Sequence, residues 1–395
     1  MKNKTLIFLS ILMLVNALAY GVIIPLLYPY AKTFGMTPLG LSLLFASFSL
    51  FQFLFTPIIG RLSDVYGRRP LLLFSILGTG LSLVMFGMAQ TIWQLFVARI
   101  IDGITGGNMS VAQAVIADSI KGPERAKAFG MLGASFGFGF LVGPAIGGFL
   151  SQYSLSAPFF FSAGLAVIAT IFGYFFLEES LPLSERKVHS RESLLNFKDM
   201  FHALSLPVIG ALFILNFITS TAGNAFIIGA QSITNDFFRL SSRDLGIYFT
   251  AIGVVSIVMQ GFGVTKLLKR FTDKPTVVFY SLALSAFIMA GLFFARTMTT
   301  HFVTVILYLI AVAPLMPLLS GLLSEKAPQA DQGEILGINQ SYMSLGQIVG
   351  PLLAGVVASV SVPSVFLLSS SLFVVGLIVT GVAFNWQFAG IKKRQ

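Results

Sequence analysis

The sequence predicts an all-α integral membrane protein whose chain crosses the bilayer twelve times in two six-helix bundles. Of its 395 residues, 56% are hydrophobic and 10% are charged, whereas about a quarter of the residues in a typical soluble domain are charged. Apolar runs of about 20 residues, each long enough to cross a hydrocarbon core of about 30 Å, recur along the chain. Short loops between these runs hold nearly all of the charge.

The apolar runs define twelve expected spans. They are residues 6–30, 40–60, 70–89, 93–117, 127–150, 158–177, 206–232, 244–265, 275–295, 301–324, 335–358 and 363–385. The longest polar interval, residues 178–200, divides these spans six and six. We therefore expect an N-terminal bundle at residues 1–177, a cytoplasmic linker at 178–205, and a C-terminal bundle with a short cytoplasmic tail at 206–395.

The first span has one alternative interpretation. The opening stretch MKNKTLIFLSILMLVNALAYG has the basic start, apolar core and small residues of a secretory signal. The apolar segment continues to about Tyr30, however, and eleven more spans follow it. We therefore favour a retained membrane span over a cleaved signal.

Basic residues are distributed unequally between the two sides of the predicted membrane. If the amino terminus is cytoplasmic, most of the 25 lysines and arginines fall on the cytoplasmic side, and Arg99 lies inside a helix. Those expected outside are Lys32, Arg239, Arg243 and Arg296. This positive-inside bias predicts a multi-pass protein of the plasma (inner) membrane with both termini in the cytoplasm. It also accounts for the net charge of +10, so the expected partner is a lipid bilayer and not a nucleic acid.

Several kinds of chemistry have no support in the sequence. The chain has no cysteine, which excludes disulfides, thiolate catalysis and cysteine-ligated metals. Its three histidines, His189, His202 and His301, have no metal-ligand spacing. No catalytic constellation and no nucleotide-binding loop is visible either. We therefore expect no metal, no cofactor, no enzymatic activity and no use of ATP.

Two similar glycine-proline segments indicate that the chain contains a duplication. GPAIGG at residues 143–148 and GPLLAG at 350–355 lie 207 positions apart. At this offset Gly130, Gly139, Gly143, Pro144 and Gly148 correspond to Gly337, Gly346, Gly350, Pro351 and Gly355. The two halves are therefore predicted to be parallel repeats, an arrangement typical of transporters that work by rocking two bundles.

The loop between the second and third spans, GRLSDVYGRRP at residues 60–70, has the composition of a tight charged turn. Gly60 and Gly67 permit the turn, Asp64 suits the positive amino end of a helix, and Arg68 and Arg69 suit a carboxylate or the lipid surface. An ordinary basic loop on the cytoplasmic side is the alternative.

This loop resembles the signature of the major facilitator superfamily, although Val65 and Pro70 replace residues that are usually basic there. The resemblance implies a cytoplasmic latch in the outward-facing state. In that latch Asp64 would meet the start of the eleventh span, and Arg68 would pair with Asp118 at the end of the fourth. The equivalent second-half segment, GVTKLLKRFTDKP, is degenerate, so we expect one working latch, in the first half.

The fifth span carries GASFGFGFLVGPAIGG at residues 133–148. Its glycines, among them Gly139, Gly143, Gly147 and Gly148, leave one face almost bare for close helix packing. Pro144 removes a backbone hydrogen bond and bends the helix. A pure packing face is the alternative to a functional one.

This span resembles the antiporter signature of exporters in the superfamily. Together with RIIDGITGGNMSVAQAVIAD and SAPFFFSAGL, it resembles the tetracycline and multidrug branch of twelve-span drug:proton antiporters. The expectation of export follows from this resemblance alone.

Asp102 is the only acid, and Arg99 the only base, that our spans place within the hydrocarbon region. Arg99 is expected roughly 9 Å and Asp102 roughly 13 Å below the external end of the span. An ionised group at such depth costs on the order of 3 kcal/mol or more, so each should face its partner or a watery cavity. The pair either fixes the fourth helix permanently or exchanges its internal pairing for a proton. The second interpretation is favoured because similar antiporters associate an arginine at the position of Arg99 with proton coupling.

Polar uncharged side chains in the spans are candidates for a substrate cavity, because amides facing lipid would lack partners. The selected residues are Asn16, Tyr20, Gln52, Asn108, Asn224, Gln231, Asn339 and Tyr342. Bridging between helices is the alternative for each. The 40 phenylalanines and 13 methionines make the rest of such a wall apolar, which suits neutral or weakly cationic amphipathic molecules.

The sequence thus predicts a monomeric exporter of amphipathic drug-like small molecules of the tetracycline or multidrug type, working by proton antiport with alternating access. Its expected partners are a small-molecule substrate and protons. One alternative is a proton-coupled exporter of a native metabolite such as a siderophore, a sugar or a lipid precursor. Another is a non-transporting membrane receptor, which the duplicated halves and glycine-rich helices disfavour.

Overall fold

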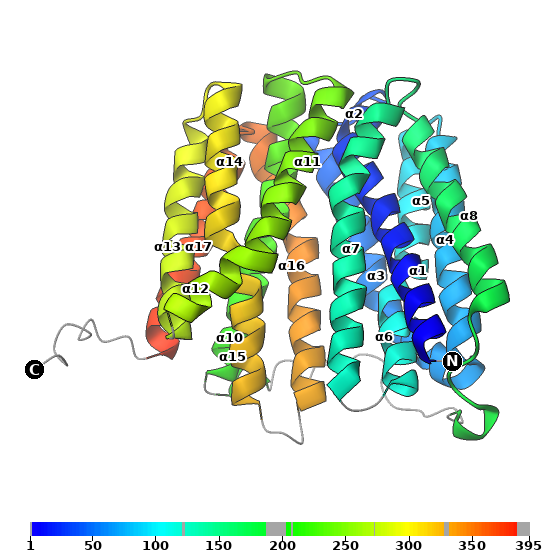
Figure 1. Ribbon diagram of the computed structural model, residues 1–395. Helices are drawn as coiled ribbons and strands as arrows, with labels where there is room; N and C mark the ends of the chain where they lie inside the picture. Colours follow the sequence, from blue (N-terminus) through cyan, green and yellow to red (C-terminus); the bar gives the residue numbers. More distant parts are fainter. Residues whose placement is uncertain are drawn as a thin grey trace, which may run out of the picture. The chain divides into compact units, whose positions relative to one another are not determined.

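A computed structural model describes residues 2–120, 123–186, 203–206, 208–271, 273–327 and 332–384 (Figure 1). These residues form helices joined by short turns, and no strand occurs among them. Ten helical segments of the described chain are long and apolar enough to cross a membrane. The predicted all-α membrane fold is therefore confirmed. Residues 187–202 of the predicted linker, with His189 and His202, lie outside the described residues.

The chain forms two compact units. The first comprises Met1–Thr37, Ser47–Leu195 and Arg239–Gly253, and the second comprises Pro38–Ala46, Asn196–Phe238 and Val254–Gln395. Two helices, α3 (Pro38–Tyr66) and α11 (Ser242–Val258), therefore contribute residues to both units. The bundle boundaries expected near residues 177 and 206 stay a prediction.

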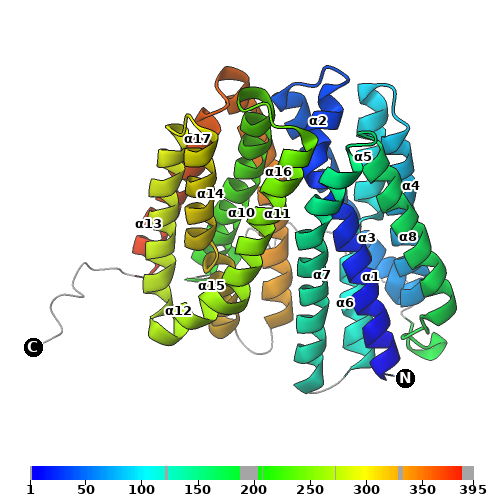
Figure 2. The same ribbon diagram turned by 45° about the horizontal axis from the view of Figure 1, so that its top comes forward.

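The first unit is built around α1 and α4. Helix α1 packs along α7 and α8, and α4 packs along α5 and α8; Figures 1 and 2 both place α1 beside α7. The elements of this unit, besides parts of α3 and α11, are α1 (Lys2–Ile23), η1 (Ile24–Leu26), α2 (Leu27–Lys32), α4 (Arg68–Gly87), α5 (Ile92–Thr105), α6 (Asn108–Ser119), α7 (Pro123–Leu150), α8 (Ala157–Phe176) and η2 (Leu183–Glu185).

The second unit is built around α10 and α13. Helix α10 packs along α16 and α17, and α13 packs along α14 and α17. The elements of this unit, besides parts of α3 and α11, are α10 (Ile209–Ser232), the π-helix η3 (Ile233–Phe237), the π-helix η4 (Met259–Gly263), α12 (Val264–Arg270), α13 (Lys274–Phe293), α14 (Met298–Val312), α15 (Leu315–Lys326), α16 (Gln332–Val360) and α17 (Ser364–Ala383).

The fourth and tenth spans, predicted as single helices over 93–117 and 301–324, are both interrupted, and this corrects the prediction. The fourth breaks at Gly106 and Gly107, and the tenth breaks at Ala313 and Pro314. Glycine is a poor helix residue, and proline has no N–H to donate to the preceding turn. Because the two breaks stand 207 positions apart, the structure repeats the offset found in the sequence.

The same two spans also begin alike. The hydroxyl of Thr91 accepts a bond from the N–H of Gln94 at the start of α5, and Thr297 does the same for Thr300 at the start of α14. In both cases the side chain of the third helical residue, Gln94 or Thr300, accepts a bond from the backbone N–H of the threonine, which completes a capping box. The broken spans of the two halves are therefore the same structural element in two copies.

Candidate functional site

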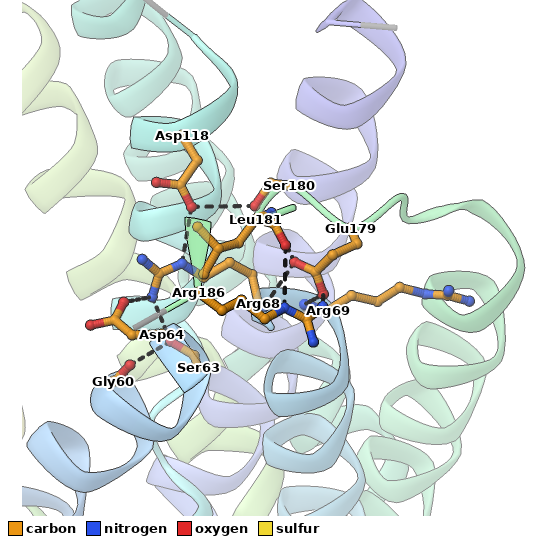
Figure 3. A network of polar contacts seen from close by, with 10 residues as sticks. All are labelled: Gly60, Ser63, Asp64, Arg68, Arg69, Asp118, Glu179, Ser180, Leu181 and Arg186. Carbon is orange, nitrogen blue, oxygen red and sulfur yellow. Dashed lines mark hydrogen bonds and ion pairs between the residues drawn. The ribbon is translucent and has the colours of Figure 1, made fainter. Parts of the chain in front are cut away.

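Arg68, the first residue of α4, lies at the centre of a polar network in the first unit (Figure 3). Its Nε lies 3.0 Å from Oδ2 of Asp118 at the end of α6, and its Nη1 lies 2.6 Å from Oδ1 of Asp64 on α3. Nη1 also donates to the hydroxyl of Ser63, which in turn donates to the carbonyl of Gly60 at 2.6 Å. One guanidinium thus links the ends of α3, α4 and α6.

The carboxylate of Glu179, just after α8, caps the amino end of α4. It accepts bonds from the backbone N–H groups of Arg68 at 2.9 Å and Arg69 at 3.2 Å. The residue before the helix, Gly67, has φ of +107° and no side chain that could make this cap. A negative charge at this position is also favourable to the helix dipole. Sequence reasoning missed Glu179, because the acid lies in a polar segment more than 100 positions away from α4.

Further residues attach the segment after α8 to the network. Ser180 donates to the same Asp118 oxygen at 3.4 Å, and Nη2 of Arg186 lies 3.7 Å from Oε2 of Glu179. The guanidinium of Arg69 donates to the carbonyl of Tyr174 and lies 5.4 Å from the centre of its ring. The predicted contact of Asp64 with the start of the eleventh span stays a prediction.

Glycines of the antiporter-like segment on α7 lie against the backbone of α1. A Cβ added at Gly139 would lie 2.5 Å from the carbonyl oxygen of Leu14, and one added at Gly143 would lie 2.6 Å from the backbone of Gly21. A side chain at Gly147 would collide with the backbone of the same helix. This face of α7 therefore admits no larger residue.

The end of the same segment crosses α11. A Cβ added at Gly148 would lie 2.8 Å from the Cα of Gly246, and one added at Gly246 would lie 2.8 Å from the carbonyl oxygen of Pro144. Pro144 lies inside α7. Close packing is thus an observed role of Gly139, Gly143, Pro144, Gly147 and Gly148, whatever further role they have.

Arg99 and Asp102 form an ion pair inside the first unit. Nη1 of Arg99 lies 2.8 Å from Oδ2 of Asp102, and the two residues are 7% and 2% exposed. The guanidinium lies 4.0 Å from the ring centre of Phe48 on α3. The pair is therefore buried between its own helix, α5, and α3.

This enclosure leaves part of the pair without partners. Among the described residues, Oδ1 of Asp102 and Nε of Arg99 are buried and have no hydrogen-bond partner. An unsatisfied buried polar group costs about 1–3 kcal/mol. A proton arriving on Oδ1 would turn this acceptor into a donor and cancel the charge of the carboxylate.

The candidate cavity residues divide between the units. Asn16, Tyr20, Gln52 and Asn108 belong to the first unit, and Asn224, Gln231, Asn339 and Tyr342 belong to the second. The structure brings Tyr20 close to the buried pair, because its ring lies 5.9 Å from that of Phe48.

Some of these polar residues are used by the fold. Nε2 of Gln52 donates at 3.2 Å to the carbonyl of Gly106, where the fourth span breaks. Asn224 bonds to the carbonyl one turn before it at 2.9 Å, and the ring of Tyr342 stacks on Phe213 at 5.3 Å. The structure thus records a bond between two helical elements for Gln52, a bond within its own helix for Asn224 and ring stacking for Tyr342.

Others keep free hydrogen-bonding capacity. Among the described residues, Nδ2 of Asn108, both side-chain polar atoms of Gln231, and Oδ1 of Asn339 are buried without a partner. Asn108 stands at the start of α6, directly after the break in the fourth span. These three are the better remaining candidates for contact with a polar substrate group.

His301 lies buried at the start of α14 and contacts aromatic rings. Its ring centre lies 5.4 Å from that of Phe238 and 5.9 Å from that of Phe366. No group of three or more histidine, cysteine, aspartate or glutamate side chains that could hold a metal occurs within the described part of the chain.

Comparison with known proteins gives a consistent result. The sequence profile described as Major Facilitator Superfamily matches residues 9–228 and 212–388. Multidrug resistance protein 2 of Bacillus subtilis (strain 168) is 30% identical over 92% of this chain and 91% of its own length. Tetracycline resistance protein, class E, of Escherichia coli is 28% identical over 95% and 94%. A solved bacterial homologue of the human lysosomal transporter Spinster has a TM-score of 0.79 at 15% identity, over 97% of both chains.

Proposed function

The chain belongs to the major facilitator superfamily, a family of transporters and not of enzymes, and on this premise we propose that it exports amphipathic drug-like molecules in exchange for protons. Relatives named for multidrug and tetracycline resistance, which match more than nine-tenths of the chain, support the substrate class. The proposed location is the inner membrane, with both termini cytoplasmic and a single chain as the working unit. Small-molecule transport follows from the family, whereas proton exchange and alternating access are the proposal.

The buried pair of Arg99 and Asp102 carries the proposal of proton exchange. An ion pair that only fixed a helix would gain from satisfying all of its polar atoms, because buried polar groups without partners are costly. Here one carboxylate oxygen has no partner in the described structure. Protonation of that oxygen neutralises Asp102 and leaves Arg99 as a lone buried cation. Such a cation is unstable, so the helices around it rearrange to give Arg99 access to water.

The network around Arg68 supports the second part of the proposal, alternating access. It joins the amino end of α4 to the ends of α3 and α6 and to the segment after α8. Opening and closing this network would change how these helices are held at their expected cytoplasmic ends. We assign Gly60, Asp64, Gly67, Arg68, Arg69 and Asp118 to this latch, with Glu179 as an additional member.

Transport in proteoliposomes tests the proposal. A pH-sensitive dye inside the vesicles, with a tetracycline or a quinolone added under an imposed pH gradient, reports substrate-dependent proton movement. An exporter of either drug moves protons when that drug is present. A receptor moves none with any ligand, and an exporter restricted to a native metabolite moves none with these drugs but responds to its own substrate.

The variant Asp102→Asn tests the role of the pair. It is expected to bind substrate and to let it flow downhill, because the amide keeps the size and the hydrogen bond to Arg99. It should abolish accumulation against a gradient, because the amide takes no proton. Uphill accumulation at the wild-type rate by Asp102→Asn would remove the pair from the coupling mechanism.

A further inference from the structure

The second unit contains an apolar groove between the π-helix η4, helices α12 and α13, and the broken tenth span. Its volume is about 450 Å³, within the range of about 300–1,000 Å³ that is typical of small-molecule sites. Its wall includes Leu267 and Phe271, Tyr280 and Leu284 of α13, and Ile310 and Pro314 of the tenth span. None of the residues that line it is charged.

The two repeats differ at the places equivalent to the groove. In the first repeat, Gly103 and Gly107 let the fourth span lie directly on α3: a Cβ on either would come within 2.6 Å of α3 atoms. The residues 207 positions later are Ile310 and Pro314, and both line the groove. The second repeat therefore has two apolar side chains at the groove where the first repeat has none.

The groove opens on an exposed apolar face. Tyr280 and Leu284, on its rim, are 64% and 48% exposed, and Phe287, which continues the same face of α13, is 78% exposed. Residues at spacings of four and three share one side of a helix. A largely apolar exposed side of a membrane helix is a lipid-facing side, so the groove is open to lipid.

A row of cations borders the groove at its α12 end. Gly263, Leu267 and Phe271 stand four positions apart and form the wall. Lys266 and Arg270, also four apart, form the adjacent row, and both are exposed. This end carries the basic loop that the positive-inside distribution places at the cytoplasmic surface. A cationic amphipathic molecule would be repelled there, and an anionic head group would be attracted.

We propose that this groove binds an anionic phospholipid of the cytoplasmic leaflet, with an acyl chain in the groove and the phosphate head group on Lys266 and Arg270. The largely apolar wall suits an acyl chain better than a polar ligand. Basic residues beside gaps between membrane helices are suited to anionic lipid head groups. This site is separate from the Arg99–Asp102 pair and from the Arg68 network, which belong to the first unit.

Lipid retention by the purified full-length protein tests the proposal. The protein is equilibrated with equal amounts of phosphatidylglycerol and phosphatidylcholine that carry identical acyl chains, and the retained lipids are counted by native mass spectrometry. Two cations near a head group are each worth about fivefold in binding, so the wild-type protein should prefer phosphatidylglycerol by about tenfold or more.

Three variants locate the site. Lys266→Gln with Arg270→Gln should reduce the preference to about onefold to twofold. Lys326→Gln removes an exposed cation from the end of α15, twelve residues or roughly 18 Å along the tenth span from Pro314, and should leave the preference intact. Leu284→Trp, at the exposed rim, should cover the groove and lower the retention of both lipids without changing their ratio.

Each contrary result rejects the site. Equal retention of both lipids by the wild-type protein would do so, as would an unchanged preference in the double variant. An equal loss in Lys326→Gln would mean general attraction by the basic surface and no built site. Recovery of a lipid-free dimer that Leu284→Trp splits would assign the groove to a second copy of the chain. Thermal unfolding of each variant confirms that a loss of binding is not a loss of folding.

Discussion

In each half of the chain, an ion pair joins two equivalent helices at their expected cytoplasmic ends, but the surroundings of the two pairs differ. In the first half, Arg68 at the start of α4 pairs with Asp118 at the end of α6. In the second half, Lys274 at the start of α13 pairs with Glu325 near the end of α15. Glu325 stands 207 positions after Asp118, so the acid has kept its place in both repeats although the surrounding motif has been lost in one.

The difference lies in what surrounds each pair. The Arg68 side chain is 12% exposed and also contacts Asp64 and Ser63, whereas Lys274 and Glu325 are 36% and 54% exposed. The positions equivalent to Gly60 and Asp64 are Leu267 and Phe271, which line the apolar groove. The equivalent ion pair is therefore exposed in the second repeat. In the first repeat it is part of a more buried network with additional partners.

The largest effect is expected from breaking the network at its centre. Arg68→Ala leaves Asp64 and Asp118 without their shared cation, and removing one partner of a largely buried pair costs on the order of 3 kcal/mol. Transport turnover in proteoliposomes should fall at least tenfold. Lys269→Ala, an exposed cation on α12, is the control. Wild-type turnover by Arg68→Ala would deny the network a role in the transport cycle.

A smaller effect is expected at the helix cap. Glu179→Gln keeps an acceptor for the α4 N–H groups but loses the negative charge, so the free energy of unfolding should fall by about 1 kcal/mol. Thermal unfolding in detergent measures this loss. Glu178→Gln is the matched control, because the neighbouring Glu178 is exposed. If both variants lose equal stability, the cap is not what makes Glu179 important.

The smallest effect is expected at the second-half pair. Lys274→Ala should change stability by less than about 1 kcal/mol, because exposed ion pairs contribute little. Turnover should stay within about twofold of wild type, and the difference should shrink further in high salt. A loss as large as that of Arg68→Ala would show that both halves carry working latches. It would contradict the expectation of one working latch, in the first half.

Much of the fold was predictable because membrane spans depend on one simple property, the length of an apolar run. The pairing of Arg68 with Asp118 was predicted from the family resemblance, because no local sequence pattern connects two residues 50 positions apart. The breaks at Gly106 and at Pro314 were missed, because hydropathy is continuous across them and only the glycine pair and the proline signal a break. Glu325 could have been found by applying the repeat offset to Asp118.

Other features of the candidate site were beyond sequence reasoning for physical reasons. Glu179 acts on backbone N–H groups, which carry no residue identity, so no partner residue pointed to it. The polar candidates divided into those with partners, such as Gln52, and those without, such as Asn108. Whether an amide is satisfied depends on the helices packed around it, and a span assignment alone does not contain that information.

In the proposed exchange, Asp102 releases a proton when substrate enters the transport cycle. Adding a transported drug to the purified protein in weakly buffered detergent, with a pH electrode or dye as the readout, measures that proton directly. The wild-type protein should release up to about one proton per bound drug, and Asp102→Asn should bind the drug and release none. Equal proton release by the two proteins, at equal drug binding, would contradict the claim.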